Sequence, residues 1–441
     1  MNKSTSYKRW ETRPLQCWDK AKEIRRKYEK ARVEAHQKNR LLVDGQDASI
    51  FTALGDLQSV MTNPLGAMIA NSSNKFSREC LGTAECQGFG REICGYHRDV
   101  FGSMYLNRDL QGGPFPRRDI SIATPAPCDQ HSLRGQPVAN YFGIPRNQGE
   151  APIYISPTAD PARDKVMLEH RVGEILDQIE WLEKVTARKF DDEVFKGQVL
   201  STMRLRSLAG EVFCLNQNIP APVDQKSLYS FFTLGGLVRG DQAATEALWK
   251  ELRDEVKWRV ENKIAAVATE RYRWVENEPP PWYYLRYYRY MEKYGAVCIG
   301  SPYSHNLGAP YEWREDGTWG SKKTPLELGW PFNTREEVVR ANVVAFMRPG
   351  QSADHPGRYQ QRMLDMAKAF HCDGAILPLW RAGVGCVYGR RENALALVEA
   401  GVSVMHYEGA QPGDRTDLDE NRMLDQLDHW MESQGLRKLE D

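Results

Sequence analysis

The sequence lacks an excess of either charge, a long apolar run and an apolar segment near its N-terminus. Its 59 basic residues balance 59 acidic ones, which argues against an electrostatic nucleic-acid binder. No apolar run approaches the roughly 20 residues that a membrane-spanning helix needs. The polar start Met1–Arg9 is unlike a secretory signal. We therefore expect a cytoplasmic protein that binds neither nucleic acid nor a membrane.

Two nucleotide-binding motifs are also missing. The nearest approach to a phosphate-cradling loop, Gly317–Thr324, has the wrong glycine spacing. The pair Gly88 and Gly90 lacks the third glycine of a dinucleotide fingerprint, because Ile93 stands in its place. We expect no ATP hydrolysis by this polypeptide.

Cysteine is present, but not at the density of a disulfide framework. Nine cysteines, an odd number, are spread over 441 residues, a length that suits two or three domains. In a reducing compartment such thiols pack in a core, bind a metal or carry redox chemistry. Their number alone leaves all three roles open.

The order of apolar segments predicts an α/β fold. Short strands such as Ile120–Ala126 and Ile153–Ser156 alternate with helices in the first third of the chain. The same rhythm returns near the C-terminus, with strands at Ala296–Ile299, Gly374–Leu379 and Val402–Tyr407. Strands separated by helices form parallel sheets, because parallel neighbours need a crossover. We expect two parallel-sheet domains of the Rossmann or flavodoxin-like kind.

Helices precede and connect these two regions. Apolar residues recur at helical spacing through Asp164–Val185 and two later stretches, and the highly charged segment Pro14–Arg40 is also helical in pattern. We interpret that charged segment as a solvated helix or an arm that packs on a partner. The expected organisation is a helical N-terminal arm (1–50), an N-terminal α/β domain (51–160), a mostly helical middle domain (161–275) and a C-terminal α/β domain (276–441).

Three cysteines share one local setting, since each precedes an expected helix. Cys94 comes before the run Asp99–Leu106, Cys128 closes an apolar stretch, and Cys386 follows a strand and a glycine-containing loop. Thiolates at helix starts meet unpaired N–H groups and the positive end of the helix dipole. Cys128 and Cys386 are expected at strand ends in two domains, where a cleft would bring them together. This setting suits an anionic metal–sulfur centre.

Nearby side chains have plainer interpretations. The spacing of Cys80 and Cys86 matches neither ferredoxin runs nor zinc pairs, so packed thiols explain them. His97 could donate protons near a site, although an ordinary hydrogen-bonded histidine is the commoner role. Asp129 is better explained as a helix N-cap than as a catalytic acid. An aromatic cluster predicts core or an interface rather than a substrate pocket; its members are Trp282, Tyr283, Tyr284, Tyr287, Tyr288 and Tyr290.

The segments around the three cysteines resemble one family. The motif Cys-Gly-Tyr-His-Arg-Asp-Val-Phe-Gly at Cys94–Gly102, Cys128–Asp129 after an apolar strand, and Cys386 in the C-terminal region are similar to the 2-hydroxyacyl-CoA dehydratase/benzoyl-CoA reductase family. The resemblance covers most of residues 50–435. Length and the Cys-Gly-Tyr-His-Arg form look most like the B-type subunit of an ATP-dependent benzoyl-CoA reductase.

The resemblance implies a cofactor and partners. It implies a 4Fe–4S cluster held by Cys94, Cys128 and Cys386, and no fourth ligand is evident in the sequence. It also implies a homologous partner subunit with a second cluster. Separate ATP-hydrolysing iron–sulfur subunits would deliver electrons that come from ferredoxin, which agrees with the missing phosphate loop.

The activity that the resemblance implies is reduction of the aromatic ring of benzoyl-CoA, an acyl-CoA substrate, to a cyclic dienoyl-CoA. The protein would exclude water, position the ring and supply protons, while the cofactor carries the difficult electron transfer. Tyr96, His97 and Arg98 lie beside a ligand cysteine and are candidates for contacts with the substrate or around the cluster. Two alternatives stay open: dehydration of a 2-hydroxyacyl-CoA by transient electron injection, and a non-catalytic electron-transfer or scaffolding subunit.

Overall fold

The computed structural model describes residues 7–45, 48–55, 57–60, 62–123, 130, 134–149, 161–234, 241–277, 279–305, 311–346, 356–381, 389–409, 411, 413–414 and 419–440. Four of the features expected from the sequence lie outside these residues: Cys128, Asp129, Cys386 and the strand Ile153–Ser156.

The N-terminal half contains a four-stranded sheet that is parallel throughout. Its strand order is β2-β1-β3-β4. Between β2 and β3 the chain forms three helices, and the second of them begins where the Ser73 side chain accepts a hydrogen bond from Phe76 N. The elements of this half are α1 (Trp18–Val33), a 3-10 turn (His36–Lys38), β1 (Leu41–Asp44), α2 (Ala48–Ala53), β2 (Leu57–Val60), α3 (Thr62–Ser72), α4 (Asn74–Cys86), α5 (Gly95–Tyr105), β3 (Ile120–Ala123), α7 (Gly135–Phe142) and β4 (Arg146–Gln148).

The C-terminal half contains a second four-stranded parallel sheet, in the order β10-β9-β5-β6, and a small antiparallel pair, β7-β8. Its elements are β5 (Tyr272–Glu276), a 3-10 turn (Trp282–Tyr284), α12 (Arg286–Glu292), β6 (Ala296–Gly300), α13 (Pro302–His305), β7 (Tyr311–Trp313), β8 (Trp319–Ser321), α14 (Arg335–Phe346), α15 (Pro356–Ala369), β9 (Gly374–Trp380), α17 (Arg390–Glu399), β10 (Ser403–Gly409) and α18 (Glu420–Ser433). The α/β class expected from the sequence is confirmed.

Strand β5 begins the second sheet inside the stretch expected to be the helical middle region. Its five residues are buried, yet Arg273 interrupts the apolar run that marks a buried parallel strand. Arg273 forms an ion pair with Glu270 and donates to the carbonyl oxygen of Phe370 at 2.7 Å. The strand therefore depends on partners from elsewhere in the chain, which local periodicity does not reveal.

The two sheets share one strand order. Numbered along the chain within each sheet, the strands run 2-1-3-4 in both, as in doubly wound sheets of the flavodoxin type. The order reverses between β1 and β3 in the first sheet and between β5 and β9 in the second. Ligands of such sheets bind beyond the carboxyl ends of the strands at these reversal points.

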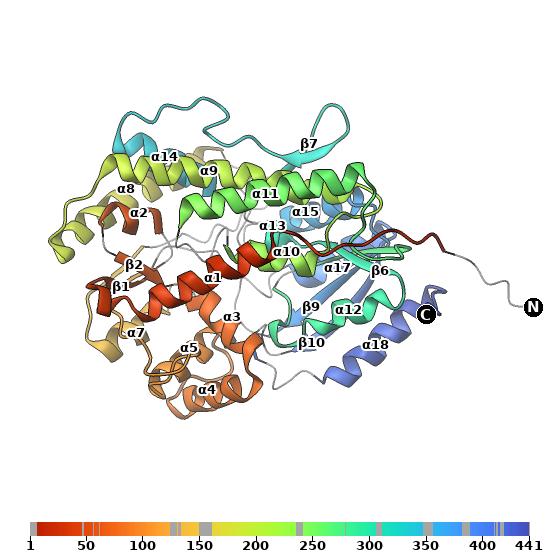
Figure 1. The fold of residues 1–441 in the computed structure, drawn as a ribbon, viewed down its shortest axis with the longest axis horizontal. Coiled ribbons are helices and arrows are strands. Elements are labelled where there is room, and N and C mark those ends of the chain that lie inside the picture. Colours follow the sequence, from red (N-terminus) through yellow and green to blue (C-terminus); the bar gives the residue numbers. More distant parts are fainter. Residues whose placement is uncertain are drawn as a thin grey trace, which may run out of the picture.

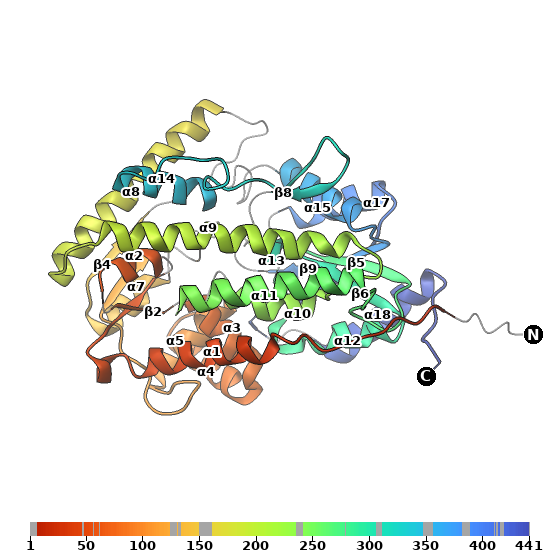
Figure 2. The same cartoon turned by 45° about the horizontal axis from the view of Figure 1, so that its top comes forward.

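Long helices join the two sheets. The middle region consists of α8 (Pro161–Thr186), α9 (Asp192–Cys214), a 3-10 turn (Leu215–Gln217), α10 (Gln225–Phe232) and α11 (Gln242–Glu261), which confirms its mostly helical character. Figures 1 and 2 show the sheets at opposite ends of the molecule, with α9 and α11 side by side between them. One end of α9 packs in the core of the first sheet through Val199 and Met203, and the other packs in the core of the second through Val212 and Phe213. No helix in the described part of the chain is both long and apolar enough to cross a membrane.

The N-terminal segment lies along its own chain, although the sequence suggested a solvated helix or an arm on a partner. Trp10 N donates to the carbonyl oxygen of Ala268 at 2.8 Å, near the second sheet. At the far end of α1, Arg32 is 1% exposed and binds Asp109 through two hydrogen bonds of 2.7 and 2.9 Å. The segment thus links the two halves, as the red helix of Figure 1 shows.

We expect Arg32→Met to lower the free energy of unfolding by roughly 3–5 kcal/mol, because the Asp109 carboxylate would stay buried without its cation. Urea denaturation measures this change. Lys20→Met is the matched control, since it breaks an ion pair with Glu251 in which both side chains are largely exposed. We expect that control to cost less than about 1 kcal/mol. Equal losses in the two variants would contradict the assigned role of Arg32.

Candidate functional site

Cys94 is the residue that immediately precedes α5. The helix begins at Gly95, about one turn earlier than the expected run Asp99–Leu106. Burial raises the pKa of Cys94 to about 11, and the N–H groups of Tyr96 and His97 and the charge of Arg98 partly oppose this shift. These N–H groups face the thiol, although neither makes a capping hydrogen bond to it. The thiol is therefore neutral near pH 7, although the nearby N–H groups and Arg98 act in favour of negative charge there.

Two glutamines from opposite halves of the chain hold the start of α5. Gln130 Oε1 accepts a hydrogen bond from Cys94 N at 3.1 Å, and Gln411 Oε1 accepts one from Gly95 N at 2.7 Å. The first N–H groups of a helix have no partner within the helix, so both bonds satisfy groups that would otherwise be unpaired. Gln130 is two residues after Cys128 in the sequence, and Gln411 is two residues after the end of β10. The start of α5 is therefore a meeting point of both sheets.

Arg98 ties the same turn to the C-terminal half. Its side chain is 0% exposed and forms ion pairs with Glu85 at 2.9 Å and with the fully buried Asp414. Its Nε also donates to the carbonyl oxygen of Ile93 at 3.0 Å. The Arg98 guanidinium thus lies between the carboxylates of Glu85 and Asp414. It holds α5 against the turn that contains Asp414.

The other two predicted contact residues are buried as well. Tyr96 is 3% exposed, and its hydroxyl accepts a hydrogen bond from Trp282 Nε1. His97 is 1% exposed, and its ring centroid is 6.2 Å from that of Phe101. Tyr96, His97 and Arg98 therefore lie inside the protein in the first turn of α5, directly after Cys94. A role for them in substrate binding stays a prediction.

The strands that lead to the other two predicted ligands lie at the reversal points of the sheets. β3 ends at Ala123, five residues before Cys128, and β9 ends at Trp380, six residues before Cys386. Among the described residues, no three His, Cys, Asp or Glu side chains form a metal-binding group. Two of the three predicted ligands lie outside those residues, so the cluster site stays a prediction. Cys80 is a fully buried thiol and Cys86 is exposed.

A buried carboxylate at the end of β5, that of Glu276, was not predicted from the sequence. Glu276 is 0% exposed and accepts hydrogen bonds from the hydroxyls of Tyr229, at 3.0 Å, and of Tyr287 and Tyr288. Burial and the charge of Glu276 raise the pKa of all three phenols well above the usual value. A carboxylate that accepts three O–H donors is stabilised in its ionised form. Tyr229 lies 5.4 Å from Trp282, ring to ring, and this connects the group to Tyr96.

The predicted aromatic cluster supplies two of these phenols and is confirmed as core. Trp282, Tyr284, Tyr287 and Tyr288 are all buried, and the remaining two members pack against the same core. The sequence indicated burial through aromatic density, whereas the carboxylate that the tyrosines surround comes from a separate strand.

Several buried carboxamides near the carboxyl edge of the second sheet have atoms without a partner. Within the described part of the chain, Gln411 Nε2 and both side-chain polar atoms of Asn277 and Asn393 make no hydrogen bond. These three residues are 0% exposed, and such atoms are rare in folded proteins without a bound group. Gln411 bonds the N–H group of Gly95, the residue after the buried thiol Cys94. Its unpaired Nε2 donor therefore fits a group with anionic sulfur, such as the iron–sulfur cluster predicted from the sequence.

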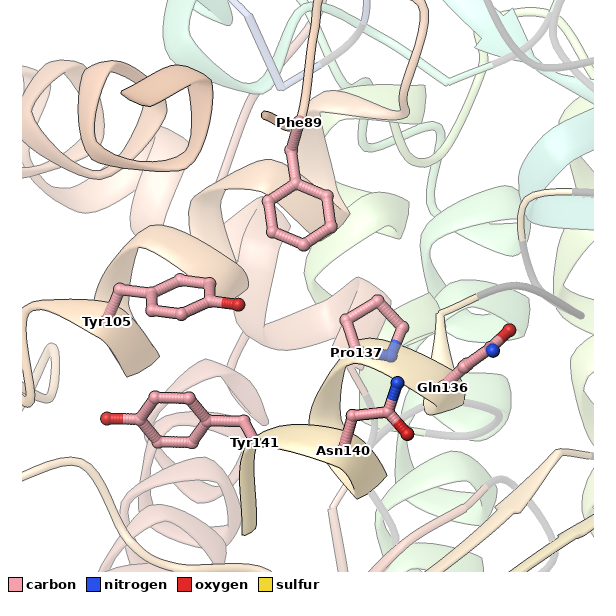
Figure 3. Close-up of a pocket in the computed structure, with 6 residues that line it drawn as sticks. All are labelled: Phe89, Tyr105, Gln136, Pro137, Asn140 and Tyr141. Carbon is pink, nitrogen blue, oxygen red and sulfur yellow. The ribbon is translucent and has the colours of Figure 1, made fainter. Parts of the chain in front are cut away.

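An open pocket of about 520 Å³ lies at the other end of α5. In Figure 3 the Tyr105 hydroxyl points across the pocket toward Pro137, while Gln136 extends away from it. Tyr105 ends α5 and Cys94 precedes it, so at 1.5 Å per residue the two are about 16 Å apart along the helix. The pocket is therefore separate from the start of α5. Its lining residues are Phe89, Tyr105, Gln136, Pro137, Asn140 and Tyr141.

A family model described as "2-hydroxyglutaryl-CoA dehydratase, D-component" matches residues 50–433. No curated protein matches the chain. The matched residues include the second sheet, strands β2, β3 and β4 of the first sheet and the helices between the sheets, and they leave out α1 and β1.

We expect Gly102→Ala to reduce the free energy of unfolding by about 3 kcal/mol or more, because a Cβ at this position would lie 1.9 Å from the carbonyl oxygen of Cys80. The close contact between α4 and α5 would have to open. Gly82→Ala in α4 is the control, since its Cβ would meet no atom within 4 Å. We expect that change to stabilise the protein by roughly 0.5–1 kcal/mol. Chemical denaturation measures both, and a mild effect at Gly102 would contradict the tight seating of α5.

Proposed function

The chain belongs to the 2-hydroxyglutaryl-CoA dehydratase D-component family, and from this premise we propose that it is the iron–sulfur subunit of an ATP-dependent benzoyl-CoA reductase. The family supports a subunit of the 2-hydroxyacyl-CoA dehydratase type. The more specific reaction rests on the similarity of Cys94–Gly102 to the B-type reductase subunit.

One observation carries the proposal: a residue close to Cys128 in the sequence and the turn after β10, the neighbour of β9, meet at the start of α5. Cys94 itself precedes the helix, and Gln130, two residues after Cys128, bonds its backbone N–H. Gln411 follows β10, whose last residue pairs with Trp380 at the end of the strand that leads to Cys386. Three cysteines that are far apart in the sequence would thereby approach one another.

Under this proposal Cys94, Cys128 and Cys386 hold a 4Fe–4S cluster. When bound, such a cluster supplies single electrons at low potential, the step that amino-acid side chains cannot perform. The residues of this chain have the supporting roles. The buried first turn of α5 keeps water away from the sulfur of Cys94, and its N–H groups favour negative charge there. Arg98 holds this turn against the C-terminal half through Asp414.

The overall reaction would add two electrons and two protons to the ring of benzoyl-CoA and release a cyclic dienoyl-CoA. Since the sequence lacks a phosphate-binding loop, ATP hydrolysis is assigned to separate iron–sulfur subunits that pass electrons from ferredoxin. A homologous partner with its own cluster would complete the acyl-CoA site.

The second candidate function is dehydration of a 2-hydroxyacyl-CoA, and the description of the matching family favours it. It would use the same cysteines, and the electron would return after each turnover. A third candidate, a non-catalytic electron-transfer or scaffolding subunit, is tested by photo-crosslinking with an acyl-CoA analogue. Label found on the partner alone would favour that third function.

We expect single Ser replacements of Cys94, Cys128 and Cys386 each to lower the iron and sulfide content of the anaerobically purified complex and to weaken its visible absorption. Cys86→Ser is the control, because this thiol is exposed and lies outside the predicted ligand set. Normal iron content and an unchanged spectrum in all three variants would contradict the cluster assignment.

The number of electrons consumed distinguishes the two reactions. We expect the complete complex to consume two electrons for each benzoyl-CoA converted, measured with a reduced dye under anaerobic conditions and product analysis by chromatography. Turnover of a 2-hydroxyacyl-CoA with far fewer electrons than product molecules would instead identify a dehydratase.

A further inference from the structure

Gln411 is a fully buried glutamine whose carboxamide oxygen has a hydrogen-bond partner among the described residues, whereas its carboxamide nitrogen has none. Its Oε1 accepts the hydrogen bond from Gly95 N at 2.7 Å, whereas its Nε2 makes no hydrogen bond with any described residue. Two bonds of about 1.2 and 1.3 Å separate the oxygen and nitrogen of a carboxamide, so Nε2 lies within about 5 Å of Gly95 N. A buried donor without an acceptor destabilises the folded protein. The position of this donor, beside the residue that follows Cys94, therefore points to an acceptor that binds there.

The turn that carries Gln411 is held firmly, so the side chain cannot turn away without breaking other contacts. Asp414 N donates to the Gln411 carbonyl oxygen at 3.1 Å, and the Asp414 carboxylate is paired with Arg98. A Cβ at Gly413 would lie 2.8 Å from Tyr96 Cδ1, so this turn and the first turn of α5 are in close contact. The unpaired N–H group is thus fixed in place next to the start of α5.

Each acidic group beside this turn has a partner, although Asp99 Oδ2 makes no hydrogen bond among the described residues. Asp414 and Glu85 are bound to Arg98, and Asp99 accepts a hydrogen bond from Ser77 at 2.8 Å. The sulfur of Cys94 belongs to the residue directly before Gly95, whose N–H group is bonded to Gln411. It is therefore the acceptor that the position of this donor points to.

We propose that Gln411 Nε2 donates a hydrogen bond to sulfur at the Cys94 site, either the ligand thiolate or an inorganic sulfide of the cluster. This inference rests on the proposed function. Hydrogen bonds to the sulfurs stabilise the more negative, reduced state and raise the reduction potential. Gln411 thereby helps set the potential at which the cluster accepts an electron.

Gln130 has a different role, although it also contacts this turn. Its Oε1 accepts from Cys94 N at 3.1 Å, and the residue is partly exposed, so water can satisfy its amide. Gln130 positions the backbone of Cys94, while Gln411 both positions Gly95 and supplies the donor.

The test uses the complete complex, purified anaerobically, with Gln411→Met and Gln411→Glu. We expect both variants to retain iron and the reduced-cluster resonance that Cys94→Ser abolishes. In a redox titration followed by electron paramagnetic resonance, its midpoint should shift to a more negative potential in both. The shift should be larger for Gln411→Glu, which keeps an acceptor for Gly95 N but adds negative charge. Gln225→Met is the control, because Gln225 is equally buried and its Nε2 is bonded to Ser304 at 2.8 Å.

A measurement on the wild-type complex covers the case in which the variants fail to fold. With glutamine labelled with ¹⁵N in its side chain, we expect a nitrogen coupling to the reduced cluster in double-resonance spectra. A normal cluster without this coupling would overturn the inference and leave the proposed function intact. Wild-type midpoints in both Gln411 variants with normal iron would do the same. A wild-type complex that holds no cluster at all would contradict the proposed function, and this inference with it.

Discussion

The arrangement of this protein depends on how the first turn of α5 is held between its two halves. Cys94 N and Gly95 N, which no helical carbonyl can satisfy, are bonded to a glutamine from each half. Arg98 adds a buried ion pair to Asp414 in the same turn. Since the thiol of Cys94 lies at this junction, any change in the relative position of the sheets would alter its surroundings. The junction therefore couples the fold to the proposed cluster chemistry.

Buried charges enforce this arrangement because each has a specific partner. Arg32 is paired with Asp109, Arg273 with Glu270, and Glu276 with three phenols. Separating such groups leaves a charge in a medium of low polarity, which is strongly destabilising. The balanced total of 59 basic and 59 acidic residues thus conceals an uneven distribution, in which a few buried pairs join distant segments.

Part of the fold and of the site could be predicted because it depends on local patterns. Apolar residues at helical spacing indicated α8 and α9, short apolar runs indicated β9 and β10, and aromatic density indicated a buried core. β5 was missed because Arg273 breaks its apolar pattern, and α1 was read as solvated because its charges are dense. In both cases the decisive partners, such as the Phe370 carbonyl oxygen and Asp109, come from contacts that spacing does not encode.

The sequence by itself determined the α/β class, the helical middle region and the helix-start setting of Cys94, because hydrophobic periodicity and helix-starting patterns act over a few residues. It also indicated the family through the residues around that cysteine. Only the tertiary structure decided that Gln130 and Gln411 meet at the start of α5. It also decided that Arg98 forms an ion pair with Asp414 and that three tyrosines surround Glu276. Burial and pairing of polar groups are properties of the assembled chain, since the partners are up to 316 residues apart.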